Sequence, residues 1–259
     1  MDSIDYADSH CHLNYPGLVE IQDDVITRMH KNNIKYALNV CTKLEEFDKI
    51  YETVSQHDFL YASVGIHPDT TKNIEATVKK LCEIGNKKKV VAIGETGLDY
   101  FRKVGENLDW QRERFRIHIR AARELKKPLI IHMREATEDT LKILKEEKAV
   151  DCGGVMHCFT ESLEVAKRAI DLNFLISISG IVTFKKAEQV QKVAANLPIE
   201  SLMVETDSPF LAPVPYRGKL NEPSHVSRVV EKISNLRDES EQYIANKTLL
   251  NFKQFVKVS

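Results

Sequence analysis

The chain has 259 residues, and its 37 Lys and Arg against 38 Asp and Glu give a formal net charge of -1 at pH 7. This length is enough to bury a substantial core, and the balanced charge excludes a global cationic field, so any nucleic-acid binding must come from a local basic patch. No apolar run could span a bilayer, the N-terminus lacks the segments of a signal peptide, and the five cysteines form no CxxC pair, so we expect a cytoplasmic protein with free thiols and no membrane association.

Short apolar runs alternate with amphipathic stretches along the chain. The runs predict strands at 6–12, 36–41, 60–66, 90–95, 128–132, 153–157, 174–179 and 201–207. The amphipathic stretches predict helices at 20–33, 74–84, 108–126, 140–148, 163–172 and 187–196. A capping box at 42–45 predicts a further helix, and 238–241 is suited to begin the last one. We expect loops at 97–107 and at 208–224, the second stiffened by four prolines.

This alternation indicates a parallel sheet with helical crossovers. About eight such units predict an α/β fold of the (β/α)8 TIM-barrel type, with a single domain over residues 1–259 and the active site at the C-terminal ends of the strands. The alternative is an open doubly wound sheet, which is disfavoured because the first turn from strand to helix carries no GxGxxG.

Two histidines stand at the end of the first predicted strand, in the stretch DSHCHL at 8–13. Side chains alternate across a strand, so Asp8, His10 and His12 are expected on one face and Cys11 on the other, where it would serve packing. Two imidazoles on one face can bind a divalent metal. Taken alone, the pair could equally be two histidines on the protein surface without a metal, because short motifs have a real false-positive rate.

Four more ligand-type side chains end predicted strands, namely Glu95, His132, His157 and Asp207. In a parallel barrel these ends meet at one mouth. A single histidine there is more often a structural residue, but six such side chains together predict a metal site. Six ligands exceed the four of a closed zinc site, so we expect two divalent ions (Mg²⁺, Mn²⁺ or Zn²⁺) bridged by Glu95, with Asp207 acting on the attacking water. Both carboxylates are therefore candidate catalytic residues.

Two further carboxylates fall one step deeper in the same strands. Asp8 shares the predicted face of His10, and Glu205 that of Asp207. A buried carboxylate needs a partner, and we expect that partner to be a ligand imidazole or a metal-bound water. The alternative is pairing with a buried Lys or Arg.

Several segments together resemble the TatD family of metal-dependent deoxyribonucleases. They are DSHCHL at 8–13, GETGLDY at 94–100, IHMREA at 131–136, MHCFT at 156–160, VETDSPFLAP at 204–213 and RGKLNEP at 217–223. The resemblance runs through the whole chain and implies a TIM-barrel hydrolase that acts on DNA, commonly described as exonucleolytic from the 3′ end. It also implies that the metal ligands are His10, His12, Glu95, His132, His157 and Asp207. Leu220 departs from the family pattern, which has a basic residue there, and His67-Pro68 resembles a further family segment.

Substrate contacts are predicted from residue type and position. Arg134, Arg217 and Lys219 could hold phosphates, although loop cations are often only solvated. Tyr100, Phe101 and Phe159 follow ligand-bearing strands and could stack unpaired bases, although packing under the loops is an equal alternative. His67 is a further candidate. We therefore expect a monomer that prefers single-stranded or frayed DNA.

Two other functions compete with DNA hydrolysis. One is a related two-metal hydrolase of another ester or amide, such as an aminoacyl ester or a small cyclic amide, because one barrel serves many chemistries. The other is a metal-bound scaffold without turnover, against which the full set of six ligand types argues. The sequence leaves open the metal, the physiological substrate, the polarity of cleavage, the balance of exonuclease and endonuclease action, and the oligomeric state.

Overall fold

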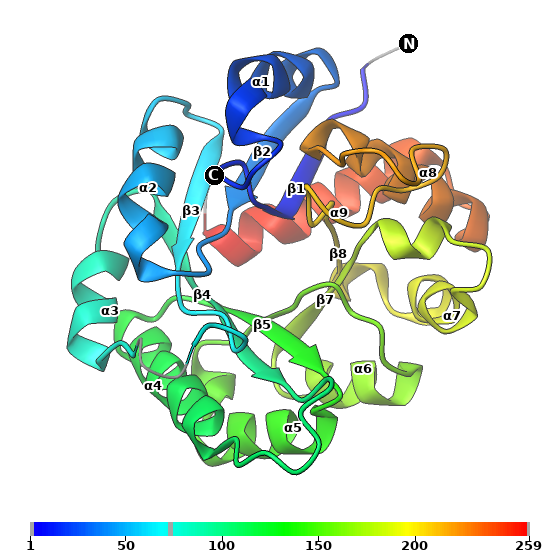
Figure 1. The fold of residues 1–259 in the computed structure, drawn as a ribbon. Coiled ribbons are helices and arrows are strands. Elements are labelled where there is room, and N and C mark those ends of the chain that lie inside the picture. The colour runs from blue at the N-terminus through cyan, green and yellow to red at the C-terminus, as the bar shows by residue number, and fades with distance from the viewer. Residues whose placement is uncertain (1–2, 72–74, 258–259) are drawn as a thin grey trace.

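Eight parallel strands lie side by side in chain order around a barrel (Figure 1). The structure is a computed structural model that describes residues 3–71 and 75–257. Each strand pairs with the next in parallel register. The strands are β1 (Tyr6–Cys11), β2 (Ile34–Asn39), β3 (Leu60–Val64), β4 (Val90–Asp99), β5 (Leu129–Arg134), β6 (Gly154–Met156), β7 (Phe174–Ile178) and β8 (Leu202–Val204). The predicted TIM barrel is confirmed, and the open doubly wound sheet is excluded.

The barrel closes between the end of β1 and the segment that follows β8. The Asp207 N–H donates to the carbonyl of His10 at 2.9 Å, and the His12 N–H donates to the carbonyl of Ser208 at 2.8 Å. Closure therefore lies at the C-terminal ends of the strands and brings the first and last ligand-bearing segments together.

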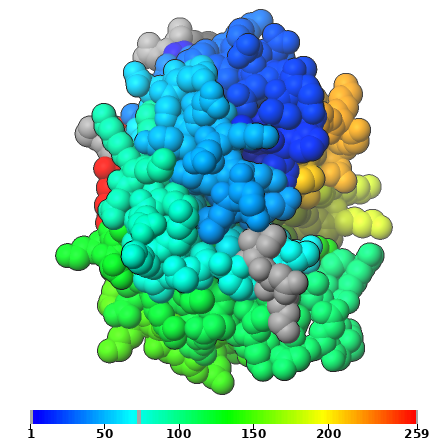
Figure 2. Space-filling view, turned by 60° about the vertical axis from the view of Figure 1, so that its left-hand side comes forward, coloured from blue at the N-terminus to red at the C-terminus, as the bar shows by residue number. Residues whose placement is uncertain are grey.

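Helices surround the strands and cover their outer face (Figure 1). They are α1 (Gln22–Lys31), α2 (Phe47–Ser55), α3 (Val78–Gly85), α4 (Asp109–Leu125), α5 (Thr137–Glu146), α6 (Leu163–Ile170), α7 (Glu188–Asn196) and α8 (Val226–Arg237). Short 3-10 turns lie at Val19–Ile21, Leu44–Glu46, Ala149–Asp151, Gly180–Thr183, Ile199–Ser201 and Pro223–His225. The main apolar core fills the layer between strands and helices. Figure 2 shows one flank of the molecule, where the blue N-terminal residues lie at the top and the green residues around α4 lie at the bottom.

A final helix, α9 (Glu241–Val256), closes the N-terminal end of the barrel. Its Phe252 and Phe255 pack against interior residues early in the strands, among them Ala7, Ala92 and Val155. The C-terminal end is left as the open mouth. The predicted start of this helix is confirmed, because the Ser240 hydroxyl accepts a hydrogen bond from the Tyr243 N–H at 3.2 Å. Within residues 3–71 and 75–257, no helix is long and apolar enough to cross a membrane.

Some predicted boundaries are wrong. The capping box at 42–45 does not form, because the Thr42 hydroxyl instead lies 2.6 Å from the hydroxyl of Tyr15, and α2 begins only at Phe47. The helix predicted at 140–148 begins at Thr137. The one predicted at 74–84 begins at Val78, and residue 74 lies outside the described residues.

The fourth strand is longer than predicted, which shortens the loop expected at 97–107. It continues through Asp99, so Glu95 lies inside the strand instead of at its end. Gly97 permits this extension, because a Cβ atom there would lie 2.0 Å from the carbonyl oxygen of His132 on β5. The close approach aligns Gly97 with His132 in the strand register.

Candidate active site

All six predicted metal ligands converge at the mouth of the barrel. His10 lies next to the last residue of β1 and His12 directly follows the strand. Glu95 and His132 lie within β4 and β5, and His157 and Asp207 follow β6 and β8. A pocket of about 810 Å³ opens over them and is lined by five of the six, all except His10, which is fully buried beneath it. Segments from both ends of the chain thus build one site.

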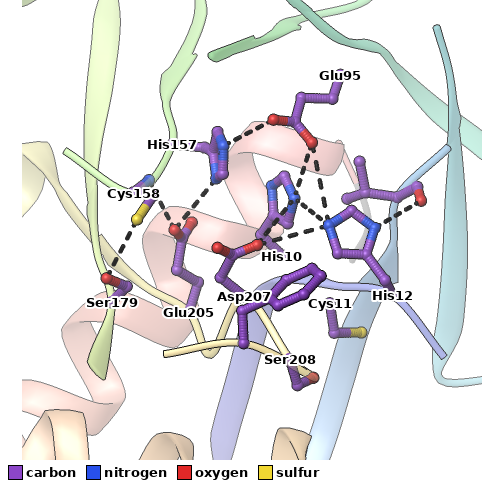
Figure 3. Close-up of polar contacts among 12 residues, drawn as sticks. His10, Cys11, His12, Glu95, His157, Cys158, Ser179, Glu205, Asp207 and Ser208 are labelled. Carbon is purple, nitrogen blue, oxygen red and sulfur yellow. Dashed lines mark hydrogen bonds and ion pairs between the residues drawn. The ribbon is translucent and has the colours of Figure 1, made fainter. Parts of the chain in front are cut away.

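Glu95 stands between two groups of imidazoles, and each of its carboxylate oxygens faces a different group (Figure 3). Oε2 lies 3.3 Å from Nε2 of His10 and 4.0 Å from Nε2 of His12. Oε1 lies 2.9 Å from Nε2 of His157 and 3.0 Å from Nδ1 of His132. Glu95 is therefore placed to contact both groups of imidazoles.

The first group consists of His10, His12 and Asp207. The Nε2 atoms of His10 and His12 are 3.1 Å apart. Oδ1 of Asp207 lies 3.7 Å from Nε2 of His10 and 3.5 Å from Nε2 of His12. The carboxylate distances are too long for good hydrogen bonds. They suit ligands of one ion, because atoms about 2.0–2.2 Å from an ion lie roughly 3–3.5 Å from one another.

The second group consists of His132 and His157, with His67 beside them. Nε2 of His67 lies 3.2 Å from Nδ1 of His132 and 3.4 Å from Oε1 of Glu95. His67 was predicted as a substrate contact. The structure places it within reach of the second group as well, and the trio of His67, Glu95 and His132 has ligand atoms within 4.8 Å of one another.

These residues fit divalent cations. The donor set is imidazole nitrogen and carboxylate oxygen, which suits Mn²⁺ or Zn²⁺, and the carboxylates also suit Mg²⁺. Nδ1 of His10 and Oε2 of Glu205 are buried and have no hydrogen-bond partner among the described residues. Buried polar atoms rarely lack a hydrogen-bond partner in a site that serves only stability. His10, His12, Glu95, His132 and His157 are among the residues that could hold such a cation.

The protein alone already holds this site in a charge-separated state. Burial opposes charge on Glu95, but the imidazoles of His157 and His67 outweigh it and lower the pKa of Glu95 well below its usual value. Burial likewise opposes charge on His157, yet Glu95 and Glu205 raise its pKa well above the ordinary value. For Asp207, burial opposes charge, but the nearby imidazoles of His12, His157 and His10 outweigh it and lower the pKa. The carboxylates are therefore available as anionic ligands near neutral pH.

Asp8 has a different partner from the one predicted. Its Oδ1 accepts from the backbone N–H of Thr206 at 2.9 Å, and its Oδ2 from the Thr206 hydroxyl at 2.6 Å. It contacts His10 only through that residue's backbone N–H, at 3.3 Å. The strand register shifts between Asp8 and Cys11, so strict alternation does not extend across this stretch. Burial raises the pKa of Asp8 to about 8 despite the bonds from Thr206. Asp8 joins β1 to the segment after β8.

Glu205 lies where the sequence predicted, against a ligand imidazole. Its Oε1 lies 3.3 Å from Nδ1 of His157 and accepts from the Cys158 N–H at 2.6 Å (Figure 3). Cys11 is buried away from the imidazoles, with its thiol 3.4 Å from the carbonyl of Leu38, in agreement with the predicted packing role.

Asp99 was missed by sequence reasoning. Its Oδ2 lies 3.1 Å from Nε2 of His132, while Nδ1 of the same ring faces Glu95. It orients His132 as Glu205 orients His157. The only sequence signal was its place in the GETGLDY segment, and the expected loop at 97–107 concealed it.

Most predicted substrate contacts lie elsewhere. Phe159 is wrong as a stacking residue, because it is only 3% exposed and packs in the main core. The Tyr100 hydroxyl donates to Asp139 at 2.6 Å, and its ring packs against the core. Arg217 lies over the ring of Phe184 at 3.7 Å, and neither it nor the exposed Lys219 lines the pocket.

Arg134 remains as a predicted contact that lines the pocket, and its guanidinium lies 3.6 Å from the ring centre of Phe101. Sequence reasoning missed two aromatic residues of the pocket, Tyr15 and Phe210. Their signals were closeness in sequence to His12 and to Asp207.

A mononuclear or binuclear cation centre of histidines and carboxylates, set in the mouth of a parallel barrel, defines the class of TIM-barrel metal-dependent hydrolases. The chain belongs to the family described as TatD related DNase, whose sequence pattern it matches over residues 7–257.

Relatives and solved structures agree with this assignment. The chain is 45% identical to the uncharacterized metal-dependent hydrolase YcfH of Escherichia coli K12, over 95% of this chain and 93% of that protein. It is 40% identical to the uncharacterized metal-dependent hydrolase YabD of Bacillus subtilis, over 97% and 99% of the two chains. The crystal structure of YJJV, a TatD homolog from Escherichia coli K12, superimposes with a TM-score of 0.90 at 27% identity, over 98% of both chains.

Proposed function

We propose that the protein is a deoxyribonuclease that removes nucleotides from the 3′ end of DNA with two divalent cations. The observation that carries this proposal is the placement of Glu95, whose two carboxylate oxygens face two different groups of imidazoles at 2.9–4.0 Å. The description of the family as TatD related DNase supports the choice of DNA. Cations bound in pairs supply charge for a phosphate oxyanion and lower the pKa of water.

The residues of the chain have distinct parts in this reaction. Asp207 is part-exposed in the pocket, with its side chain 14% accessible. Its lowered pKa keeps it anionic, so it can orient a water molecule and accept its proton. Glu205 and Asp99 hold the rings of His157 and His132 in place. Arg134 presents an exposed cation at the rim for a flanking phosphate.

The decisive experiment is an assay on end-labelled DNA with Mg²⁺, Mn²⁺ or Zn²⁺ supplied in turn. Single-stranded, frayed and blunt duplex substrates labelled at either end would be compared, with Asp207→Asn as the inactive control. Loss of label from the 3′ end first, faster on single strands and absent in the variant, is the expected result. An aminoacyl ester and a small cyclic amide are run alongside. Hydrolysis of either, with DNA left intact, would select the alternative function and refute this one.

We also propose that the protein works as a cytoplasmic monomer. Five thiols without disulfide partners, at Cys11, Cys41, Cys82, Cys152 and Cys158, suit a reducing compartment. All six ligands come from one chain, so the site is complete without a second copy. Light scattering of the purified protein tests the oligomeric state, and cell fractionation tests the location.

A further inference from the structure

An aromatic side chain stands open at the rim of the candidate active site. Phe210 is 51% exposed and lines the pocket over the metal ligands. The other aromatic side chain that is similarly open within the described residues, Tyr243, lies on α9 at the far end of the barrel. Single exposed apolar residues are common on protein surfaces, so the place of Phe210, rather than its exposure, is what matters.

A series of rings connects this rim to the metal ligands. The ring of Tyr15 stacks on the imidazole of His12, with centroids 4.5 Å apart and planes inclined by 16°. Phe210 meets Tyr15 edge to face at 6.0 Å. A planar group placed against Phe210 would therefore lie two ring contacts away from the ligand His12.

The position of Phe210 is fixed relative to Asp207. The Phe210 N–H donates to the carbonyl of Asp207 at 2.9 Å. Its own carbonyl accepts from the side-chain amide of Asn221 at 2.6 Å, and Asn221 is fully buried. The same amide donates to the carbonyl of Thr206 at 2.9 Å. Because the backbone is held on both sides, the loop that carries the ring has little conformational entropy to lose on binding.

The mouth is apolar on one side and cationic on the other. Phe210, with Leu211 and Ile181, forms the apolar rim. Arg134 ends β5, and in a barrel of eight strands in chain order that end lies across the mouth from the segment after β8. A ligand with a flat apolar part and a flanking anionic part matches both sides, with the ligand carboxylates and imidazoles between them.

Resting on the proposed function, we propose that Phe210 is the stacking platform for the base of the nucleotide next to the scissile phosphate. Tyr15 supports the Phe210 ring from the side of the metal ligands, and Arg134 faces the next phosphate. The substrate class is thus a strand end whose last base is unpaired and unstacked. A base still paired in a duplex has its faces covered and could not reach this ring.

The test compares Phe210→Ala and Phe210→Tyr with Val214→Ala as the matched control. Val214 is 48% exposed in the same loop but does not line the pocket. Two single-stranded oligonucleotides are used, one intact and one abasic at the 3′-terminal nucleotide. Affinity is measured by fluorescence anisotropy on metal-loaded protein, with phosphorothioate linkages to slow cleavage, and KM and kcat on ordinary linkages. Circular dichroism checks the fold of each variant.

We expect loss of the terminal base to weaken wild-type binding about 5- to 150-fold, the range of one base–aromatic stack. Phe210→Ala should bind the intact strand more weakly by a similar factor and bind the abasic strand as wild type does. In the kinetics, the change should appear mainly in KM. Phe210→Tyr and Val214→Ala should behave as wild type. If DNA is cut but both strands bind equally, the platform is refuted and the nuclease function stands. If DNA is neither bound nor cut, both fall. If Phe210→Ala also weakened the hydrolysis of an apolar carboxylic ester by the same factor, Phe210 would contact apolar groups in general, and the proposed role as a base platform would be refuted.

Discussion

The carboxylate of Asp99 lies 3.1 Å from Nε2 of His132, and the opposite nitrogen of that ring, Nδ1, lies 3.0 Å from Glu95. The carboxylate of Asp99 thus orients an imidazole whose other ring nitrogen faces Glu95. Burial opposes charge on Asp99, but the hydrogen bond with His132 prevails and lowers the pKa of Asp99.

We expect Asp99→Asn to weaken metal binding at the group of His132 and His157 by about 10- to 100-fold, since the ring loses its anionic partner. Chelator competition at limiting metal measures the loss, and added metal should restore activity. Asp109→Asn is the control, because that carboxylate pairs with Arg112 and contacts no ligand. An unchanged chelator profile in Asp99→Asn would show that the contact does not support the metal.

Glu205 and Asp207 should differ in role. Asp207→Asn keeps the shape but removes the proton acceptor, so turnover should fall by about 100- to 10,000-fold. Glu205→Gln acts through the ring of His157 and should lower metal affinity about 10- to 100-fold. Titrating both variants with metal separates them, because excess metal should rescue Glu205→Gln alone. Rescue of both, or of neither, contradicts this division.

Chelation should abolish hydrolysis and leave the barrel folded. The ligands lie at the mouth, while the apolar core and α9 hold the barrel beneath them. Activity and circular dichroism are followed on the same chelated sample, with verified removal of metal. Full activity there would refute the metal mechanism, and global unfolding would show that the metal is structural instead.

Stability should depend on pH through His118, which is fully buried on α4. Its Nε2 accepts from the Ile66 N–H at 3.0 Å and its Nδ1 lies 2.8 Å from the carbonyl of Arg114, so the ring is neutral. Burial lowers its pKa from 6.5 to about 4. Between these values the unfolded chain binds the extra proton, so the stability from His118 is complete above pH 6.5 and is lost as the pH falls toward 4.

Because of His118, the free energy of unfolding should fall by about 2 kcal/mol between pH 7.5 and pH 5. Urea unfolding of wild type and of His118→Gln at both pH values measures the difference, because Gln cannot gain a proton. The variant should lose about 2 kcal/mol less than wild type over this range. Equal losses would mean that His118 is already exposed to protonation in the folded protein.

The sequence by itself determined the barrel and the six ligand-type residues at its mouth. Apolar runs and amphipathic stretches alternate with periods set by strand and helix geometry, and these signals are local. Parallel strand ends must meet at one mouth, so His10, His132, His157 and Asp207 could be grouped before any distance was known. Glu95 joined them even though β4 continues past it to Asp99.

Only the tertiary structure decided which side chains support or surround these ligands. Asp99 contacts His132 because β4 runs four residues beyond Glu95. Asp8 bonds Thr206 because the barrel closes between β1 and the segment after β8. Phe159 is buried, whereas Phe210 is open at the rim. Such outcomes depend on the register and packing of segments far apart in sequence, which local periodicity cannot specify.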